Sequence, residues 1–378
     1  MIKILVVTLG LLLLLALSAC QSAKYYSQAI NGQYQILLDR QPISEMMTDT
    51  DTPVTLRNRL MFILKVREFA ENELQLPVKN HYLTYVDLKR PFVVWNVFAT
   101  PEFSLVPKTW CYPIVGCAAY RGFFSEENAR QYADALKNRN YDVYVGGVTA
   151  YSTLGWFDDP VLSTFMRLSE ARIAALIFHE LAHQILYVAG DTAFNESFAT
   201  AVEQEGLRKW QIASRNSQIY RDYLYDYRCQ RLFIGLIMKY RRKLEFLYQT
   251  DLTPADKREK KASIFTELRK EYERIKAQQT DLAVYAGWMD QPLNNARIIS
   301  VATYHDFVPA FQKMIAAHEG NLNQFYLACK NLAQKKKAER HHILKTYAEK
   351  QESVSVQSAL LSLPGFADPG ASVFNLDR

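Results

Sequence analysis

The spacing of hydrophobic and polar residues divides the chain into a mixed first half and a helical second half. Residues 55–76 place apolar side chains at helical spacing, which predicts a long helix. Residues 92–98 are rich in strand formers, and residues 141–153 alternate as a strand does. Between them, residues 125–138 predict a helix with Ser125 as its N-cap. This order predicts a small mixed sheet.

The second group of elements begins with a long, largely apolar helix at about residues 161–189, with Gly190 as its stop. Asp191 or Thr192 would then cap a further helix. The chain after it is highly charged and predicts a helical hairpin at about residues 210–280, with a narrow apolar seam. The hairpin is either a solvated structural element or an arm that binds a partner. We therefore expect an α+β, mostly helical fold in which the small mixed sheet packs beside the long apolar helix.

The long apolar helix and its successor carry the most informative residues, which are His179, Glu180, His183 and Glu196. Positions four apart share a helix face, so both histidines can direct a ring nitrogen at one metal ion. Glu196 would be the third protein ligand, and Glu180 would take a proton from a water in the fourth position. Such a pattern also arises by chance in surface helices, but residues 176–185 carry no charge apart from Glu180. Burying these groups without a metal ion is costly, so a catalytic zinc site is predicted.

The arrangement resembles zinc peptidases that carry His-Glu-x-x-His on one helix and Asn-Glu-x-x-Ala on the next, here residues 179–183 and 195–199. Residues 111–124 and 150–157 also resemble a bacterial family of predicted aminopeptidases. The resemblance implies a zincin-like catalytic region, one zinc ion per chain and peptide substrates. The chain departs from better-known aminopeptidases in a shorter gap between the two motifs. It also lacks a Gly-Ala-Met-Glu-Asn segment, which in those enzymes holds the substrate's amino terminus.

Further candidate residues follow the two motifs. Glu203 lies on the same helix face as the third ligand, where it orients a ligand histidine or forms a surface salt bridge. Peptidases of this kind need a donor that stabilises the oxyanion, and Tyr304 and His305 are the catalytic candidates. Arg297 is a candidate for substrate binding. The alternative is that these last three are core or capping residues.

The predicted strand before the motif helix is a candidate peptide-binding edge. In the zinc peptidases that the chain resembles, an edge strand beside the site pairs with the substrate backbone. Residues 144–153 are the candidate for that strand, with Tyr151 as a substrate-binding residue. The alternative is a purely structural strand with a bulge at Gly146-Gly147.

The first residues predict export from the cytoplasm. The apolar run at residues 4–17 follows Lys3 and is too short to span a membrane, which needs about 20 residues. It ends in Leu-Ser-Ala-Cys, which resembles a bacterial lipoprotein cleavage box and makes Cys20 the lipidated residue. An ordinary signal peptide is the alternative. By resemblance to sorted lipoproteins, the Gln rather than Asp at position 21 favours the outer membrane, so we expect a lipid-anchored protein of the bacterial cell envelope that faces the periplasm.

Four segments summarise the expected organisation. They are a signal peptide (1–19), a lipidated tether (20–30), a mixed α/β zincin-like catalytic region (31–206) and a mainly helical region (207–378).

Composition and cysteine content add two constraints. With 49% hydrophobic and 13% aromatic residues among 378, the chain is globular, and a net charge of +6 without a nucleic-acid motif predicts no nucleic-acid partner. Cys111 and Cys117 are spaced for a local disulfide in an oxidising compartment, with zinc binding as the alternative. Cys229 and Cys329 either pair or are buried free thiols.

Together these features predict a zinc-dependent metallopeptidase, an aminopeptidase by resemblance, that hydrolyses peptides in the cell envelope. One alternative is an endopeptidase with the same mechanism. The other is a non-enzymatic binding lipoprotein with a structural metal site. The sequence argues against this alternative, because a structural zinc site normally has Cys or His as its fourth ligand. The sequence sets no oligomeric state.

Overall fold

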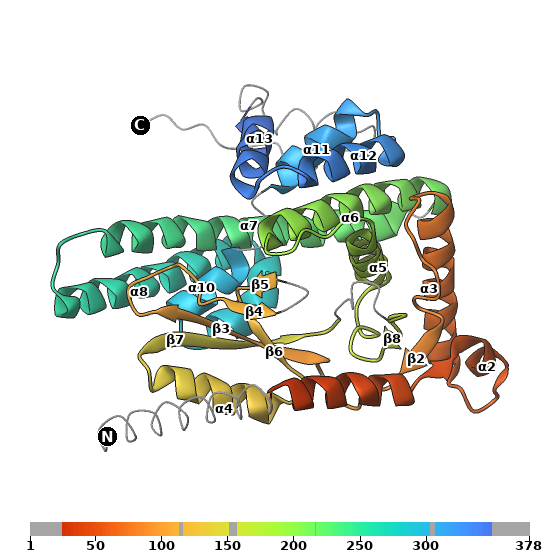
Figure 1. The fold of residues 1–378 in the computed structure, drawn as a ribbon, viewed down its shortest axis with the longest axis horizontal. Coiled ribbons are helices and arrows are strands. Elements are labelled where there is room, and N and C mark those ends of the chain that lie inside the picture. The colour runs from red at the N-terminus through yellow and green to blue at the C-terminus, as the bar shows by residue number, and fades with distance from the viewer. Residues whose placement is uncertain (1–24, 113–115, 151–156, 216, 303–306, 350–378) are drawn as a thin grey trace, which may run out of the picture.

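The structure is a computed structural model that describes residues 25–349, except for 113–115, 151–156, 216 and 303–306 (Figure 1). Helices dominate and three small sheets lie among them, so the fold is α+β and mostly helical, as predicted. Within these residues, no helix is both long enough and apolar enough to cross a membrane.

The described chain begins with a helix at residues 25–38, which we call the N-terminal helix. The tether predicted for residues 20–30 is therefore helical from residue 25 onward. A mixed three-stranded sheet of order β1-β2-β8 follows, with β1 antiparallel and β8 parallel to β2. The elements up to this point are β1 (Gln41–Pro42), α2 (Ile43–Thr48), α3 (Val54–Asn72) and β2 (Thr84–Val86).

The strand β8 (Val161–Leu162) corrects the predicted start of the motif helix. Both of its residues pair with β2, so they are extended rather than helical. The helix α5 (Glu170–Ile185) begins only after Ser169, whose side chain caps it by accepting a backbone N–H from the first turn. The prediction of a helix at 161–189 was thus too long at both ends. The nonlocal pairing of β8 is invisible in the helical spacing, and the backbone becomes extended at Leu186, directly after Ile185.

The second sheet has the order β6-β3-β7 and is antiparallel throughout, so the mixed sheet predicted here is wrong in its strand directions. The strands β3 (Val94–Pro101) and β7 (Tyr141–Val148) pair without interruption, so Gly146-Gly147 forms no bulge. The helix α4 (Glu126–Lys137) packs on this sheet, and β6 (Arg121–Phe123) forms its other edge. Ser125 accepts a backbone N–H at the start of α4, which confirms the predicted cap.

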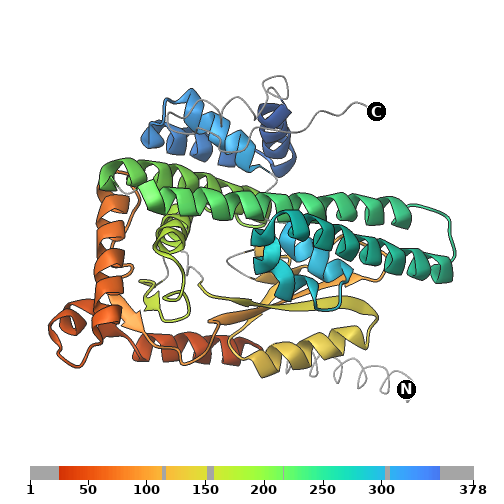
Figure 2. The ribbon, with the colours of Figure 1, turned by 180° about the vertical axis from the view of Figure 1, so that it is seen from behind.

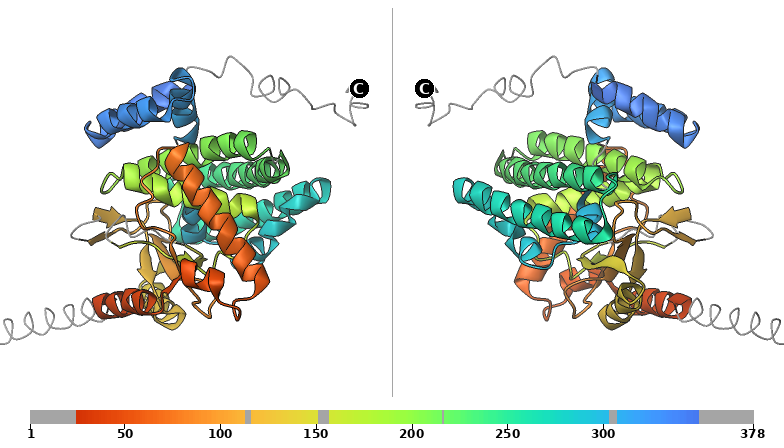
Figure 3. Two further views of the ribbon diagram at one scale, coloured as in Figure 1. Left: turned by 90° about the vertical axis from the view of Figure 1, so that its right-hand side faces the viewer. Right: turned by 90° about the vertical axis from the view of Figure 1, so that its left-hand side faces the viewer.

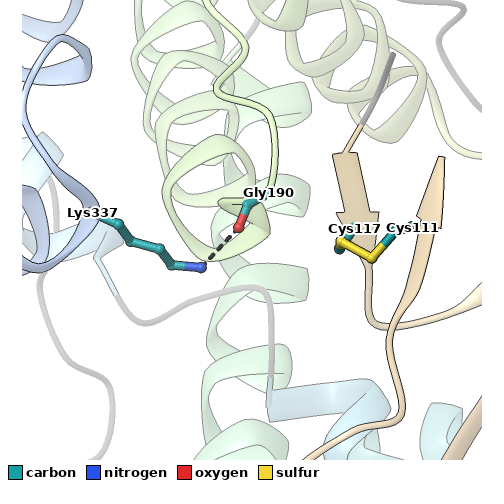
Figure 4. Close-up of a disulfide and its surroundings, with 4 residues drawn as sticks. All are labelled: Cys111, Cys117, Gly190 and Lys337. Atoms are coloured by element: carbon teal, nitrogen blue, oxygen red, sulfur yellow. Dashed lines mark hydrogen bonds between the residues drawn. A yellow bond between two sulfur atoms is a disulfide. The ribbon is translucent and has the colours of Figure 1, made fainter. Parts of the chain in front are cut away.

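A hairpin of β4 (Trp110–Tyr112) and β5 (Gly116–Ala118) carries the predicted disulfide between Cys111 and Cys117. The hairpin lies beside the turn that contains Gly190 (Figure 4). Gly116 has a φ of +75°, and a Cβ there would lie 2.9 Å from the backbone nitrogen of Gly190. Only a glycine allows this close approach.

The second half of the chain contains the predicted hairpin (Figure 2). The hairpin consists of α7 (Ser217–Tyr248) and α8 (Pro254–Gln278), which pack through an apolar seam that includes Phe265, Leu268 and Tyr272. Cys229 lies in this cluster and Cys329 in the main core, and both are free thiols, so they do not pair. The helices of this half are α6 (Thr192–Ser214), α7 (Ser217–Tyr248), α8 (Pro254–Gln278), η1 (Thr280–Tyr285), α9 (Ala286–Met289) and α10 (Asn295–Ala302).

Three C-terminal helices lie on the far side of α6 and α7 from the sheets (Figures 1 and 3). They are α11 (Val308–Ala317), α12 (Leu322–Ala333) and α13 (Lys337–Glu349).

A buried ion-pair network joins α13 to the turn between α5 and α6. Asp191 caps α6 and is almost fully buried. Its carboxylate accepts hydrogen bonds from Nε and Nη2 of Arg340 at 2.9 and 2.6 Å and lies 2.8 Å from Nε2 of His341. The Nζ of Lys337 donates to the carbonyl of Gly190 at 2.8 Å (Figure 4). The last described helix thus holds the turn that connects the two motif helices.

Candidate active site

The helix α5 carries His179, Glu180 and His183 through the main hydrophobic core. Ile177, Phe178 and Leu181 are buried around these residues, which fixes the rotation of the helix. His183 is also buried, whereas His179 and Glu180 are partly accessible.

The helix α6 is held against α5 by two local features. Asn195 donates its Nδ2 to the carbonyl of Val188 and accepts the N–H of the same residue, at 2.9 and 2.8 Å. The Asn of the second motif therefore fixes the turn that precedes Glu196. Farther along α6, a Cβ on Gly206 would lie 2.7 Å from the ring of Phe178, so the absence of a side chain lets the two helices approach closely.

His179, His183 and Glu196 converge on one point. The Nε2 of His179 lies 3.3 Å from Oε2 of Glu196, and the Nε2 of His183 lies 3.8 Å from Oε1. One ligand atom from each residue lies within 4.8 Å of the others. Donors about 2.1 Å from a tetrahedral zinc ion lie roughly 3.4 Å apart, so the set fits such an ion. These three residues could hold a metal ion, as the sequence predicts.

Glu203 lies behind this group. Its Oε2 is 3.0 Å from Nδ1 of His179, the ring nitrogen that points away from Glu196. The hydroxyl of Tyr223 donates to its Oε1 at 3.4 Å. Of the two predicted alternatives, a contact with His179 is the one observed.

Burial and nearby charge shift the pKa values of this group in opposite directions. Burial lowers the pKa of His179, but hydrogen bonds to Glu196 and Glu203 outweigh it and hold the pKa well above its usual value. Burial lowers the pKa of His183 to about 4 and raises that of Glu180 to about 7. His183 is thus neutral near pH 7, the state in which imidazole binds a metal ion.

The candidate metal ligands lie in the wall of a cavity of about 720 Å³, and Glu180 lines it with them. The opposite wall is formed by β3, β7 and the segment after the disulfide hairpin. Aromatic rings from several elements line the cavity, namely those of Phe98, Tyr112, Tyr120, Tyr144, Tyr187 and Trp288. A second cavity of about 330 Å³ also borders His179 and Glu180, and Glu203 and Asp226 contribute further carboxylates to its wall.

A family model described as "Putative aminopeptidase" matches residues 24–344. The chain belongs to this aminopeptidase family. The match spans every residue of the metal-ligand group, both cavities and the disulfide hairpin. No curated protein and no solved structure matches the chain.

Two tyrosines of this member of the aminopeptidase family, Tyr120 and Tyr187, were not among the site residues predicted from the sequence. Burial, followed by the negative charge of Glu196, raises the pKa of both Tyr120 and Tyr187, and both line the large cavity. Tyr120 comes from the segment between β5 and β6, far from the motifs in sequence, so no spacing pattern connects it to them. Its ring contacts Phe98, with centroids 5.5 Å apart.

The other predicted residues have different outcomes. Tyr151, Tyr304 and His305 lie outside the described residues, as does Cys20. Arg297 is 3% exposed and lies behind the cavity wall, with its guanidinium 4.7 Å from the ring centroids of both Tyr144 and Trp288. It supports the aromatic wall from outside, and its direct contact with a substrate stays a prediction.

Proposed function

We propose that this member of the aminopeptidase family is a zinc-dependent aminopeptidase that hydrolyses peptides in the bacterial cell envelope. The observation that carries the proposal is the convergence of His179, His183 and Glu196 in a cavity wall that also contains Glu180. Two imidazoles and one carboxylate are the ligand set of a catalytic zinc site, which keeps one position open. The cavity volume of about 720 Å³ suits a short peptide segment.

The residues of the site have distinct roles in the chemical step. A zinc ion bound by the three ligands would polarise the scissile carbonyl and lower the pKa of a water to about 7. Glu180 takes the proton of the attacking water and returns it to the leaving amine. Glu203 accepts a hydrogen bond from Nδ1 of His179, which orients the ring and increases the basicity of Nε2.

Tyr120 is our first choice for the residue that stabilises the oxyanion. The negative charges of Glu196 and Glu180 contribute to the raised pKa of its hydroxyl, and its side chain lines the same cavity. Because burial keeps the phenol protonated, it can donate a hydrogen bond to a developing negative charge. Tyr304 and His305 remain candidates for the same role.

The free edge of β7 is the proposed binding site for the peptide backbone. Among the described strands, β7 pairs with β3 alone. The Nδ2 of Asn294 donates to the carbonyl of Val143, which covers this edge at its start. Gly146, Gly147 and Val148 lie beyond that point and line the large cavity, so a substrate could add there as a further strand.

The smaller cavity is the proposed site for the substrate's amino terminus. It borders His179 and Glu180, and the carboxylates of Glu203 and Asp226 lie in its wall. Arg172 neutralises part of this charge through an ion pair with Asp226 at 2.6 Å. Net negative charge next to the scissile bond would favour a peptide with a free, positively charged amino group.

A lipid anchor on Cys20 and a location at the outer membrane, facing the periplasm, complete the proposal. Both rest on the resemblance of residues 17–20 to a lipoprotein cleavage box and on the Gln that follows.

The test is the zinc content of the purified protein beside a Glu196→Ala variant, with Glu205→Gln as a matched control. Glu205 is on the same helix but pairs with Arg208. We expect about one zinc ion per chain in the parent and the control, and a loss in Glu196→Ala. A zinc content that does not change in Glu196→Ala would contradict the proposed ligand set. Peptides with free and blocked amino termini then separate an aminopeptidase from an endopeptidase.

A further inference from the structure

The N-terminal helix exposes a continuous apolar stripe. Tyr26, Ile30, Tyr34 and Leu38 are 43%, 69%, 54% and 58% exposed. They are spaced four residues apart, so they cover an arc of about 120° along one helix face. Other large exposed apolar side chains, such as Phe246 and Leu327, belong to helices that also carry charged residues.

The opposite face of the same helix is fixed to the protein. The backbone N–H of Phe124 donates to Oε1 of Gln28 at 3.0 Å, and a Cβ on Gly32 would lie 2.2 Å from the ring of Phe124. Ile36 is buried in the main core. The guanidinium of Arg121 lies 3.7 Å from the ring centroid of Tyr25. The apolar stripe is therefore held outward and cannot turn into the core.

The helix also lacks the charges of an ordinary surface helix. Residues 25–38 contain no Asp, Glu, Lys or Arg, and their polar side chains are Ser, Asn, Gln and Tyr. A solvent-facing helix of this length normally carries several charged residues. Tyrosine combined with aliphatic side chains is typical of the boundary between lipid headgroups and acyl chains.

We propose that this stripe lies on the bilayer surface, so that the protein is held at the membrane by the N-terminal helix as well as by its lipid anchor. Only residues 21–24 separate Cys20 from the first described residue of the helix, and five extended residue steps span about 17 Å. An acyl chain on Cys20 thus keeps the stripe close to the lipid. This inference rests on the lipid anchor in the proposed function.

The orientation has a consequence for the active site. Tyr25 and Ala29, on the fixed face of the same helix, line the large cavity. α4 lies along the same side of the molecule as the N-terminal helix, whereas α11, α12 and α13 lie on the opposite side (Figures 1 and 2). The membrane would therefore lie beside one wall of the substrate cavity, and the C-terminal helices would point away from it.

The test uses residues 20–378 with Cys20→Ser, so that no acyl chain contributes, and vesicles of phosphatidylethanolamine and phosphatidylglycerol. Flotation of this parent protein is compared with that of Ile30→Asp/Tyr34→Asp and of Phe246→Asp/Leu327→Asp. The second pair removes two apolar side chains of similar exposure elsewhere on the surface. We expect the parent and the control to float weakly, and binding to fall about tenfold or more when the stripe carries charges. Because the stripe has no charge, its contribution to binding should persist when added salt screens the net positive charge of the protein from the anionic lipid.

Three outcomes would overturn this inference: no flotation of the parent, equal flotation of the two double variants, or a dimer that Ile30→Asp/Tyr34→Asp dissociates. The last would assign the stripe to a contact between copies of the chain. Circular dichroism of both double variants checks that they fold. Vesicle binding needs neither zinc nor substrate, so its failure is distinct from a failure of the peptidase proposal.

Discussion

Replacing Glu203 tests whether the residue behind His179 contributes to metal binding. The contact is short, at 3.0 Å, and both side chains are only 19% exposed, so solvent screens it weakly. Removing a carboxylate that holds a ligand histidine typically weakens metal affinity 10- to 100-fold, which corresponds to about 1.4–2.8 kcal/mol. Glu203→Gln keeps a hydrogen-bond acceptor and loses the charge, so we expect a loss of about tenfold. Glu203→Ala removes both the acceptor and the charge, so the loss of zinc affinity should approach 100-fold.

The assay is a competition titration in which a fluorescent zinc chelator of known affinity competes with the protein. Glu205→Gln is the control, because Glu205 is two residues away on α6 and pairs with Arg208 at 2.7 Å. Thermal unfolding of the zinc-free proteins checks that neither change disturbs the fold. Zinc affinities within about twofold of the parent for both Glu203 variants would refute the reasoning.

Three further predictions concern packing, the α13 network and catalysis. Gly206→Ala should destabilise the protein by about 1–3 kcal/mol in urea unfolding, because its Cβ would meet Phe178, whereas Gly235→Ala has open space and should be neutral or stabilising. Arg340→Ala should lower the free energy of unfolding by about 3–5 kcal/mol, because it leaves the buried Asp191 poorly paired. Lys337 is exposed, so Lys337→Ala should lower it by less than about 1 kcal/mol. Tyr120→Phe should lower kcat about 100- to 1000-fold with little change in KM. If only Tyr187→Phe has this effect, the oxyanion role belongs to Tyr187.

The parts of the site that could be predicted depend on local spacing. His179 and His183 lie on one face because they are four residues apart in a helix, and the Asn-Glu motif on the next helix added Glu196. The cap at Ser125 and the disulfide between Cys111 and Cys117 were likewise local patterns. Each of these patterns involves residues that are close in sequence.

The features that were missed depend on contacts between distant residues. β8 pairs with β2 across more than seventy residues, which the helical spacing around it does not reveal. Arg340 reaches Asp191 across a sequence separation of 149 residues. Tyr120 enters the cavity from a segment of short strands that carries no catalytic pattern. The N-terminal helix contains Asn and Gly and no charge, and a tether was predicted at residues 20–30, which include its first residues.

The most direct test of the central claim is the rate of peptide hydrolysis by the zinc-loaded protein and by Glu180→Gln, with the zinc content measured on the same samples. Glu180 lines the cavity but is not a ligand, so we expect both proteins to hold about one zinc ion per chain. The parent should release amino-terminal residues from short peptides with free amino termini, and Glu180→Gln should be slower by about 100-fold or more. Equal rates in the two proteins at equal zinc content would contradict the proposed mechanism.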